Sequence, residues 1–484
     1  MSDSLAPLTR RTLLAHAPLA AATLLPLPAL ALPGTKLPGA ARPGTTLPGW
    51  FDDLERRTFN YFWDLANRRN GLVPDRWPTP SFASIAAVGF ALTAYPVGVE
   101  RGWITRRDAA ALTLTTLRFF DTAPQGDAPT GMSGHKGFFY HFLDMETGRR
   151  FRDTELSSVD TTLLFLGILF AGAWYDRADP QEAEIRRLAQ RITDRADWPW
   201  FTNARGSVSM GWHPGQGFIE RAWEGYNEGM MVYVVGLGSR GSALHDGAWE
   251  AWTKTYPSFW RGTGATRHLA FAPLFGHQYS QMWIDFRGIR DATMRRAGFD
   301  YCENSRRATY ANRAYCIANP MGWDGYGRDI WGLTACDGPA NVRLPFKDRT
   351  AEYFGYAARG PLGQPDERDD GTLAPTAALG SLAFAPEIVV PAADAMRRWP
   401  RLYGKYGFLD SFNPSFRDTN AKLEAGSVDP QSGWVDGDYL GIDQGAIAGA
   451  IANARNEGIW RVMRRSPTIR RGLQRAGFTG GWLG

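Results

Sequence analysis

The chain has 484 residues, of which 44% are hydrophobic and 21% charged, so it can bury a large core and is not intrinsically disordered. Its formal net charge of +5 is modest, and Lys and Arg are spread along the chain, so no nucleic-acid-binding protein is predicted. Aromatic residues reach 13%, with 19 Trp. Many of them must pack the core, but flat apolar faces also suit stacking on sugar rings.

The N-terminus has the pattern of an export signal. Arg10 and Arg11 precede an Ala- and Leu-rich run that ends in Ala-Leu-Ala at 29–31, a small-residue cleavage site. Residues 1–31 are therefore predicted to be a signal peptide of twin-arginine type, with a general secretory signal as the alternative. The protein is expected in the periplasm or outside the cell. Prolines interrupt the apolar run, so no stable membrane anchor is predicted.

A linker and a first helix follow. Residues 32–49 repeat Pro-Gly four times, which favours a flexible linker because this pattern sustains neither a helix nor a strand. From Trp50 to Leu65, apolar residues recur at three- and four-residue spacing and predict an amphipathic helix. A single catalytic domain is expected over 50–484. Further helices are predicted over 84–97, 105–122, 157–175, 183–196, 226–237, 247–258, 278–287, 291–317, 374–382, 385–399 and 443–457.

The fold class follows from how these helices alternate. Strands are predicted only in short pieces such as 138–143 and 151–154. The helix over 157–175 is apolar nearly all round, whereas the helix over 183–196 carries charge on one face. This alternation favours a mainly α protein with a double ring of helices, whose polar and aromatic motifs lie in loops at one end.

The cysteines and histidines do not indicate a metal site. Cys302, Cys316 and Cys336 are too widely spaced for a C-x-x-C zinc site, and the seven histidines lack H-E-x-x-H spacing. No metal and no other cofactor is predicted. Buried free thiols are favoured, with a Cys302–Cys316 disulfide as the alternative. The sequence predicts no oligomeric state.

The first of three polar clusters precedes the helix over 157–175. It contains Glu155 and Asp160, and Ser157 stands three residues before Asp160, which is the spacing of a helix-capping box. Capping is therefore an alternative to a substrate-facing role for Asp160, and the two roles are compatible.

The second cluster surrounds Glu228. Asn227 is a candidate helix cap, and Glu228 would lie in the first turn, where the helix dipole favours a carboxylate. A capping carboxylate needs no aromatic neighbours, yet Trp223 and Tyr226 stand beside Glu228. An apolar wall raises a carboxyl pKa toward the value that a general acid needs at neutral pH.

The third cluster surrounds Asp410. Aromatic residues flank it, Phe412 among them, and Asn-Pro at 413–414 already supplies the turn signal, so a turn role does not explain Asp410. Trp434 follows further along the chain. Asp443 precedes an apolar helix, so capping is its alternative role.

These clusters, together with residues 278–288, 330–339 and 371–377, resemble the glucoamylase-like hydrolases, and within them the bacterial β-1,2-glucanases of glycoside hydrolase family 144. The resemblance extends over 50–460. It implies an (α/α)6 barrel that hydrolyses β-1,2-glucan, an oligo- or polysaccharide substrate, by an inverting reaction. The mode is expected to be endo. An exo-acting enzyme that releases a disaccharide, a transglycosylase and a glycan-binding protein are the alternatives.

The resemblance also implies roles for single residues. Glu228 is expected to be the general acid and Asp410 the general base, about 6.5–9.5 Å apart as in inverting enzymes, with Glu155 and Asp160 as further acidic residues of the site. Glu224 stands where Asp is expected, which leaves the preferred chain length open. The residues expected to bind substrate are Trp223, Tyr226, Trp283, Arg287, Trp331, Asp337, Phe412, Trp434 and Asp443.

Overall fold

The computed structural model describes residues 45–364 and 367–484. The predicted signal peptide and most of the predicted linker lie outside these described residues. The first helix, α2 (Trp50–Leu65), contains the predicted apolar repeat, and it buries Phe51, Leu54 and Phe62. It contacts the later helices α3 and α14. Most regular structure in the chain is helical, which confirms the predicted mainly α class.

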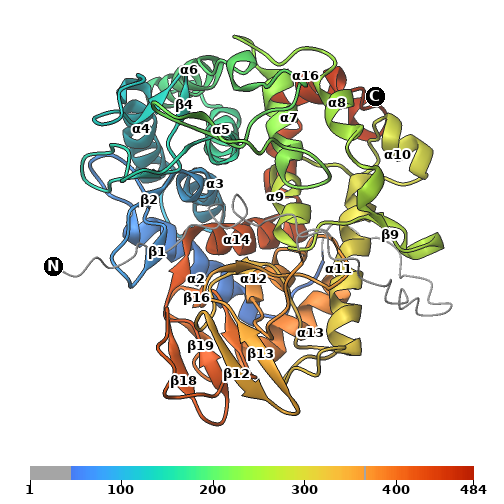
Figure 1. Cartoon of the computed structure of the whole chain (residues 1–484). Coiled ribbons are helices and arrows are strands. Elements are labelled where there is room, and N and C mark those ends of the chain that lie inside the picture. The colour runs from blue at the N-terminus through green and yellow to red at the C-terminus, as the bar shows by residue number, and fades with distance from the viewer. Residues whose placement is uncertain (1–44, 365–366) are drawn as a thin grey trace.

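Within residues 45–364 and 367–484, six helices are buried on nearly all sides, because their residues are mostly apolar or small. Each contacts the next in chain order, and the last returns to the first, so that their contacts close a cycle (Figure 1). Between the fourth and fifth of them, Gln278 Nε2 donates a hydrogen bond to the Ala377 carbonyl at 2.7 Å. The six are α3 (Ile85–Glu100), α5 (Ser158–Trp174), α7 (Gly229–Gly238), α9 (Phe275–Trp283), α12 (Pro375–Leu379) and α14 (Gly441–Asn456).

Glycines allow α3 and α5 to approach closely. A Cβ atom on Gly89 would lie 2.2 Å from the carbonyl oxygen of Leu163, and one on Gly167 would lie 2.1 Å from the carbonyl oxygen of Gly89. Backbone atoms cannot move aside as a flexible side chain can, so this helix pair tolerates no larger residue at either position.

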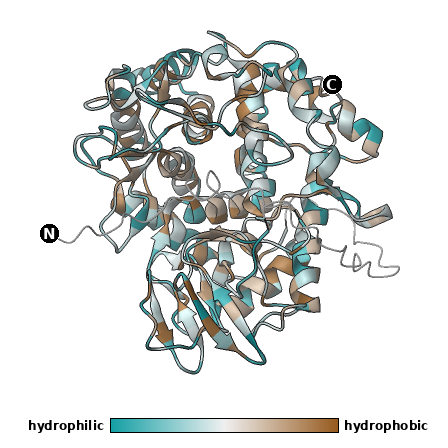
Figure 2. Cartoon of the chain, viewed as in Figure 1, coloured by the Kyte–Doolittle hydropathy of each residue, from teal (hydrophilic) through white to brown (hydrophobic). Residues whose placement is uncertain are grey.

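A second set of helices packs around the first. In particular α4 contacts α6, α6 contacts α5, α16 contacts α7, α11 contacts α9 and α13 contacts α12. Figure 2 shows the difference in hydropathy between the apolar α7 and the hydrophilic stretches of the peripheral α10. These helices are α4 (Arg106–Thr122), α6 (Pro180–Asp194), α8 (Ala248–Thr253), α10 (Ala292–Ala297), α11 (Tyr301–Ala318), α13 (Pro386–Arg397), α15 (Gly458–Met463) and α16 (Pro467–Arg475).

The strands are short and antiparallel. The longest pair is the hairpin of β12 and β13, which shares an apolar cluster with the three-stranded sheet β17–β19–β18 (Figure 1). The strands are β1 (Arg76–Trp77), β2 (Ala83–Ser84), β3 (Gly134–His135), β4 (Phe138–Phe139), β5 (Phe142–Leu143), β6 (Leu156–Ser157), β7 (Gly211–His213), β8 (Gly217–Phe218), β9 (Trp260–Arg261), β10 (His268–Leu269), β11 (Ala335–Cys336), β12 (Val342–Phe346), β13 (Arg349–Tyr353), β14 (Ala357–Ala358), β15 (Tyr403–Gly404), β16 (Gly407–Phe408), β17 (Phe412–Asn413), β18 (Ser427–Asp429), β19 (Gly433–Val435) and β20 (Tyr439–Leu440).

Two predicted elements are wrong, and the predicted helix over 247–258 is too long, because α8 ends at Thr253. Residues 151–154 are not a strand, because Arg152 adopts a positive φ of 50° and turns the chain before β6. The predicted helix over 291–317 is two helices, α10 and α11. Gly298 ends α10 with a φ of 83°, and the Asp300 side chain caps α11 by accepting a hydrogen bond from the Glu303 amide.

Two further features bear on the sequence predictions. Cys302, Cys316 and Cys336 are buried and form no disulfide among the described residues, which agrees with the favoured prediction of thiols. Within the described ranges, no helix combines the length and the apolar character needed to span a lipid bilayer.

Candidate active site

Three of the predicted acidic residues lie at the N-terminal ends of buried helices. Asp160 lies in the first turn of α5, Asp443 in the first turn of α14, and Glu228 immediately precedes α7. The strands that lead into α14, α3 and α5 are linked by a series of pairings through β20, β1, β2, β5 and β6. These helix ends therefore lie together, and they bring acidic residues from distant segments into one region.

The first carboxylate cluster is centred on His141. Its Nδ1 lies 2.9 Å from Glu155 Oε1, and its Nε2 lies 3.6 Å from Asp160 Oδ1. Ser157 caps α5, since its hydroxyl oxygen accepts a hydrogen bond from the Asp160 amide. The Asp160 carboxylate accepts a hydrogen bond from Ser157 and also lies near His141, so Asp160 belongs both to a capping arrangement and to the cluster.

The segment before α7 buries Glu228 together with two aromatic residues close to it in sequence. Glu228 is 2% exposed, and both Trp223 and Tyr226 are buried. Trp223 Nε1 donates a hydrogen bond to Ser158 Oγ at 2.9 Å, which ties this segment to the start of α5. The predicted cap is one position off. Glu228 occupies the N-cap position of α7 instead of its first turn, and Asn227 precedes it, with its side chain accepting a hydrogen bond from the Gly229 amide.

The second carboxylate cluster is centred on Arg76. Arg76 Nη1 lies 2.7 Å from Asp337 Oδ2 and 3.6 Å from Asp438 Oδ2. The Asp337 amide donates a hydrogen bond to Asp410 Oδ2 at 2.7 Å, and the Asp410 amide donates one to the Asp438 carbonyl at 3.0 Å. Carboxyl oxygens of Asp337, Asp410 and Asp436 lie within 4.8 Å of one another. So close an approach of three carboxyl groups requires a compensating proton or cation.

The charges of this second cluster perturb one another. Burial raises the pKa of Asp436 well above its ordinary value, and the neighbouring Asp337 carboxylate raises it further, against the opposing effect of Arg76. Burial alone would lower the pKa of Arg76, but the surrounding carboxylates, Asp337 first, outweigh it and raise that pKa. Asp436 thus holds its proton more tightly than an exposed aspartic acid does.

A buried ion pair supports the backbone next to this cluster. Arg359 and Asp370 are both fully buried and form a two-pronged pair, with Nε–Oδ1 at 2.7 Å and Nη2–Oδ2 at 2.9 Å. Arg359 Nη1 also donates a hydrogen bond to the Cys336 carbonyl at 2.7 Å, directly before Asp337. Burial opposes the charge of Asp370, but Arg359 outweighs burial and lowers the pKa of Asp370.

Three predicted substrate-binding aromatics lie in the core near the second cluster. Trp331 is fully buried, the Phe412 ring packs on Trp399 at 5.2 Å between centroids, and Trp434 Nε1 donates a hydrogen bond to the Ala425 carbonyl at 2.8 Å. In this structure they support the backbone that carries Asp410 and Asp436, and their predicted contact with sugar remains a prediction.

Trp283 and Arg287 do not join the candidate site. Trp283 is the last residue of α9, and Arg287 Nη2 pairs with Glu457 Oε1 at 2.9 Å. Glu457 follows the C-terminal end of α14, whereas Asp443 lies in its first turn. At 1.5 Å per residue, these two ends are roughly 20 Å apart. The sequence motifs grouped Trp283 and Arg287 with the acidic clusters. The structure does not, because α9 places both residues at the opposite end of the six buried helices.

Sequence reasoning missed five residues of the candidate site. The two clusters also contain His141, Asp75, Arg76, Asp436 and Asp438. The acidic and aromatic residues of the segment 434–439 were a usable signal for two of them. Arg76 and His141 lie in segments with no such signal.

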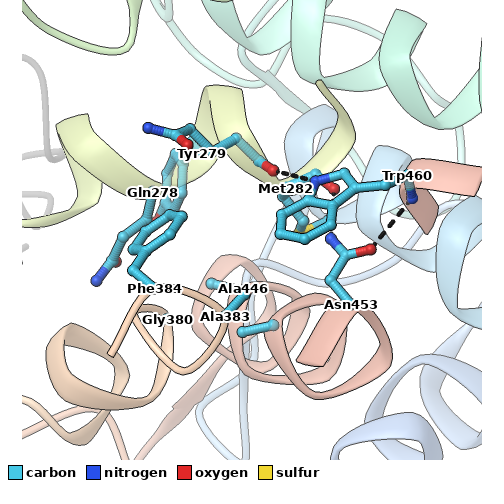
Figure 3. A pocket seen from close by; sticks show the side chains of 11 residues that line it. Gln278, Tyr279, Met282, Gly380, Ala383, Phe384, Ala446, Asn453 and Trp460 are labelled. Atoms are coloured by element: carbon cyan, nitrogen blue, oxygen red, sulfur yellow. Dashed lines mark hydrogen bonds between the residues drawn. The ribbon is translucent and has the colours of Figure 1, made fainter. Parts of the chain in front are cut away.

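The interior between α9, α12, α14 and α15 is nearly filled. Figure 3 shows a cavity there, across which Trp460 Nε1 donates to the Gln281 carbonyl at 2.6 Å. The cavity has room for roughly one water molecule. This cavity is too small for a sugar. We therefore take the pair of carboxylate clusters as the candidate active site.

Comparisons with known proteins identify a family and solved structures of similar fold. Residues 220–467 match the family model Glycoamylase, described as "Putative glucoamylase". A Bacteroides uniformis protein described in the same words has a crystal structure with a TM-score of 0.76 and 30% identity, covering 91% of this chain and 100% of that one. An endo-β-1,2-glucanase from Chitinophaga pinensis, solved with sophorotriose and glucose, has a TM-score of 0.74 and 25% identity, covering 90% of this chain and 98% of that one.

A curated relative is also similar. An exo-β-1,2-glucooligosaccharide sophorohydrolase from Parabacteroides distasonis is 26% identical over 461 residues, which cover 88% of this chain. The chain spans 57% of the length of that relative.

Proposed function

The chain belongs to the Glycoamylase family, and on that basis we propose that it is a glycoside hydrolase that cleaves β-1,2-glucan. The observation that carries this proposal is the gathering of buried carboxylates at the N-terminal ends of three of the six buried helices, α5, α7 and α14. We propose that this helix cycle is an (α/α)6 barrel. Two relatives of similar structure or sequence act on β-1,2-linked glucose, which supports the linkage.

The proposed reaction is an inverting hydrolysis that uses side chains and water. Glu228 gives a proton to the leaving glycosidic oxygen, and Asp410 removes a proton from the water that attacks the anomeric carbon from the opposite face. The bond between that carbon and the leaving oxygen breaks as the new C–O bond forms. Glu155, Asp160 and Asp443 bind sugar hydroxyls, since a carboxylate accepts hydrogen bonds from hydroxyl groups.

Replacement of Glu228 tests the assignment of the acid. Glu228→Gln should lower kcat on linear β-1,2-glucan by about 10²–10⁴-fold, because the amide cannot supply the proton. The matched control is Glu224→Gln in the same segment, where Glu224 is partly exposed and pairs with Arg205. The control should keep kcat within about threefold of wild type. Normal turnover by Glu228→Gln would refute the role of Glu228.

The product profile distinguishes endo from exo action, and we propose endo action. An endo enzyme releases glucans of many lengths at early times, whereas an exo enzyme releases disaccharide from the first turnover. The Parabacteroides relative favours the exo alternative and the Chitinophaga relative favours the endo mode. Binding of the glucan without release of reducing sugar would identify a glycan-binding protein. Anomer detection by NMR checks the inverting stereochemistry.

We also propose that the protein acts in the periplasm or outside the cell. The charged and apolar segments of residues 1–31 support this. Cell fractionation should recover a shorter, processed form outside the cytoplasm. Replacement of Arg10 and Arg11 by Lys should retain the precursor inside if the signal is of twin-arginine type.

A further inference from the structure

The second carboxylate cluster has more negative than positive charge. It contains five aspartates, of which four interact with Arg76 and one, Asp410, stands beside Asp337 and Asp436. Arg76 is the cation that interacts with them in the described part of the chain. Burying so many like charges is costly unless a proton or a second cation compensates them. The five are Asp75, Asp337, Asp410, Asp436 and Asp438.

Hydrogen bonds and ion pairs indicate which aspartate holds a proton. Asp337 contacts Arg76, Asp438 accepts a hydrogen bond from the Thr79 amide at 2.9 Å, and Asp410 accepts one from the Asp337 amide. These contacts stabilise ionised carboxylates. Asp436 differs from them: its Oδ1 accepts a hydrogen bond from the next amide, while its buried Oδ2 has no hydrogen-bond partner among the described residues.

The position of Asp436 Oδ2 suits a protonated oxygen. Asp436 is 3% exposed, and its carboxyl group stands within 4.8 Å of those of Asp337 and Asp410. A hydroxyl there would satisfy the buried oxygen and remove one of three adjacent negative charges. The Arg76 guanidinium stands against Asp337 on the same cluster, so a metal cation would meet a positive charge beside it.

We propose that Asp436 is a positioning residue that carries the proton of this cluster and donates it in a hydrogen bond toward Asp410, directly or through one water. Asp410 then stays ionised and can act as the general base, so the inference rests on the function proposed above. The other charged groups that face Asp436 are Asp337, Asp438 and Arg76. Burial and repulsion by Asp337 hold the Asp436 proton against the opposing effect of Arg76.

Two variants with the same charge test the donated hydrogen bond. Asp436→Asn keeps an N–H donor, whereas Asp436→Ala removes it, and neither side chain can ionise. In a plot of kcat against pH, the acid limb reports the pH at which the general base gains its proton. In Asp436→Ala this limb should shift to higher pH by about one unit. It should stay in place in Asp436→Asn.

Other shifts of the acid limb would overturn the proposal. If Asp436 is ionised, both variants remove a negative charge beside Asp410, and the limb moves down in both. If Asp436 has no effect on Asp410, the limb moves in neither. Loss of wild-type activity in EDTA, restored by Ca²⁺ or Mg²⁺, would show that a cation compensates the cluster and would also overturn the proposal.

A readout without substrate separates this inference from the proposed function. Wild-type protein near neutral pH should show the infrared carbonyl band of protonated carboxylic acids, and this band should be weaker in Asp436→Asn, where the proton of the proposed general acid Glu228 remains. Circular dichroism and a thermal melt check that the Asn variant is folded. If the band behaves as expected but β-1,2-glucan is not cleaved, the proposed function fails and the Asp436 proton stands. An unchanged band in Asp436→Asn refutes the proton itself.

Discussion

A buried histidine gives the protein a pH-dependent stability. His277 lies in α9 with its ring 4.9 Å from the Tyr226 ring, in contact with the segment that carries Glu228. Burial, aided by His268, lowers the pKa of His277 to about 3, whereas an exposed histidine has a pKa near 6.5. The folded protein therefore keeps this ring neutral at a pH where the unfolded chain protonates it. Its contribution to stability is complete above pH 6.5 and decreases as the pH falls toward 3.

The size of the effect follows from the two pKa values. At about pH 5, protonation of the unfolded chain at this site lowers the free energy of unfolding by about 2 kcal/mol, a factor of roughly 30. Urea unfolding of wild type and His277→Gln at about pH 7.5 and pH 5 measures it. The free energy of unfolding of wild type should fall by about 2 kcal/mol more than that of the variant, since glutamine does not titrate.

The exposed His245 supplies a matched control. His245→Gln should follow the wild type at both pH values, because its ring is in solvent in the folded and the unfolded chain. The reasoning is refuted if wild type and His277→Gln lose equal stability. It is equally refuted if NMR shows the His277 ring titrating near pH 6.5 in the folded protein.

Three further perturbations test the packing and the two clusters. Gly167→Val should destabilise the protein by about 1–3 kcal/mol in urea unfolding, because its side chain would meet the Gly89 carbonyl; unchanged stability would contradict the close α3–α5 contact. Asp370→Asn should cost about 3–5 kcal/mol by leaving Arg359 buried with its charge uncompensated, and a neutral outcome would show that this pair is dispensable. His141→Gln should lower kcat/KM on β-1,2-glucan by about 10- to 100-fold, since hydrogen bonds to charged groups are worth ~1.5–3 kcal/mol; activity like that of wild type would remove His141 from the site.

Local periodicity determined most of the helices. The apolar residues of a helix follow the faces that it buries. The apolar spacing of α2 and the continuous apolar run of α5 are therefore visible in the sequence. The break between α10 and α11 also had a local signal, since Gly298 and Asp300 are a helix end and a cap. The hairpin of β12 and β13 was missed, although Lys347 and Asp348 separate two strand-like runs in the manner of a two-residue turn.

The candidate site was only partly readable from the sequence. Glu155, Asp160, Glu228, Asp410 and Asp443 stand in polar motifs next to apolar helices, a pattern visible without a structure. That pattern does not tell which motifs share an end of the fold. The sequence motif around Arg287 looked like the motifs that carry these acidic residues. The direction of α9 nevertheless places Arg287 far from them.

Tertiary structure alone decided the composition of the two clusters. His141 reaches Asp160 because β5 and β6 belong to one series of strand pairings, and Arg76 reaches Asp337 across 261 positions of the chain. Charge interactions depend on distance in space and on burial, neither of which the order of residues records. The sequence by itself determined the helical class and the acidic motifs. Only the fold brought Asp436 beside Asp410, and the proposed hydrogen bond between them depends on that proximity.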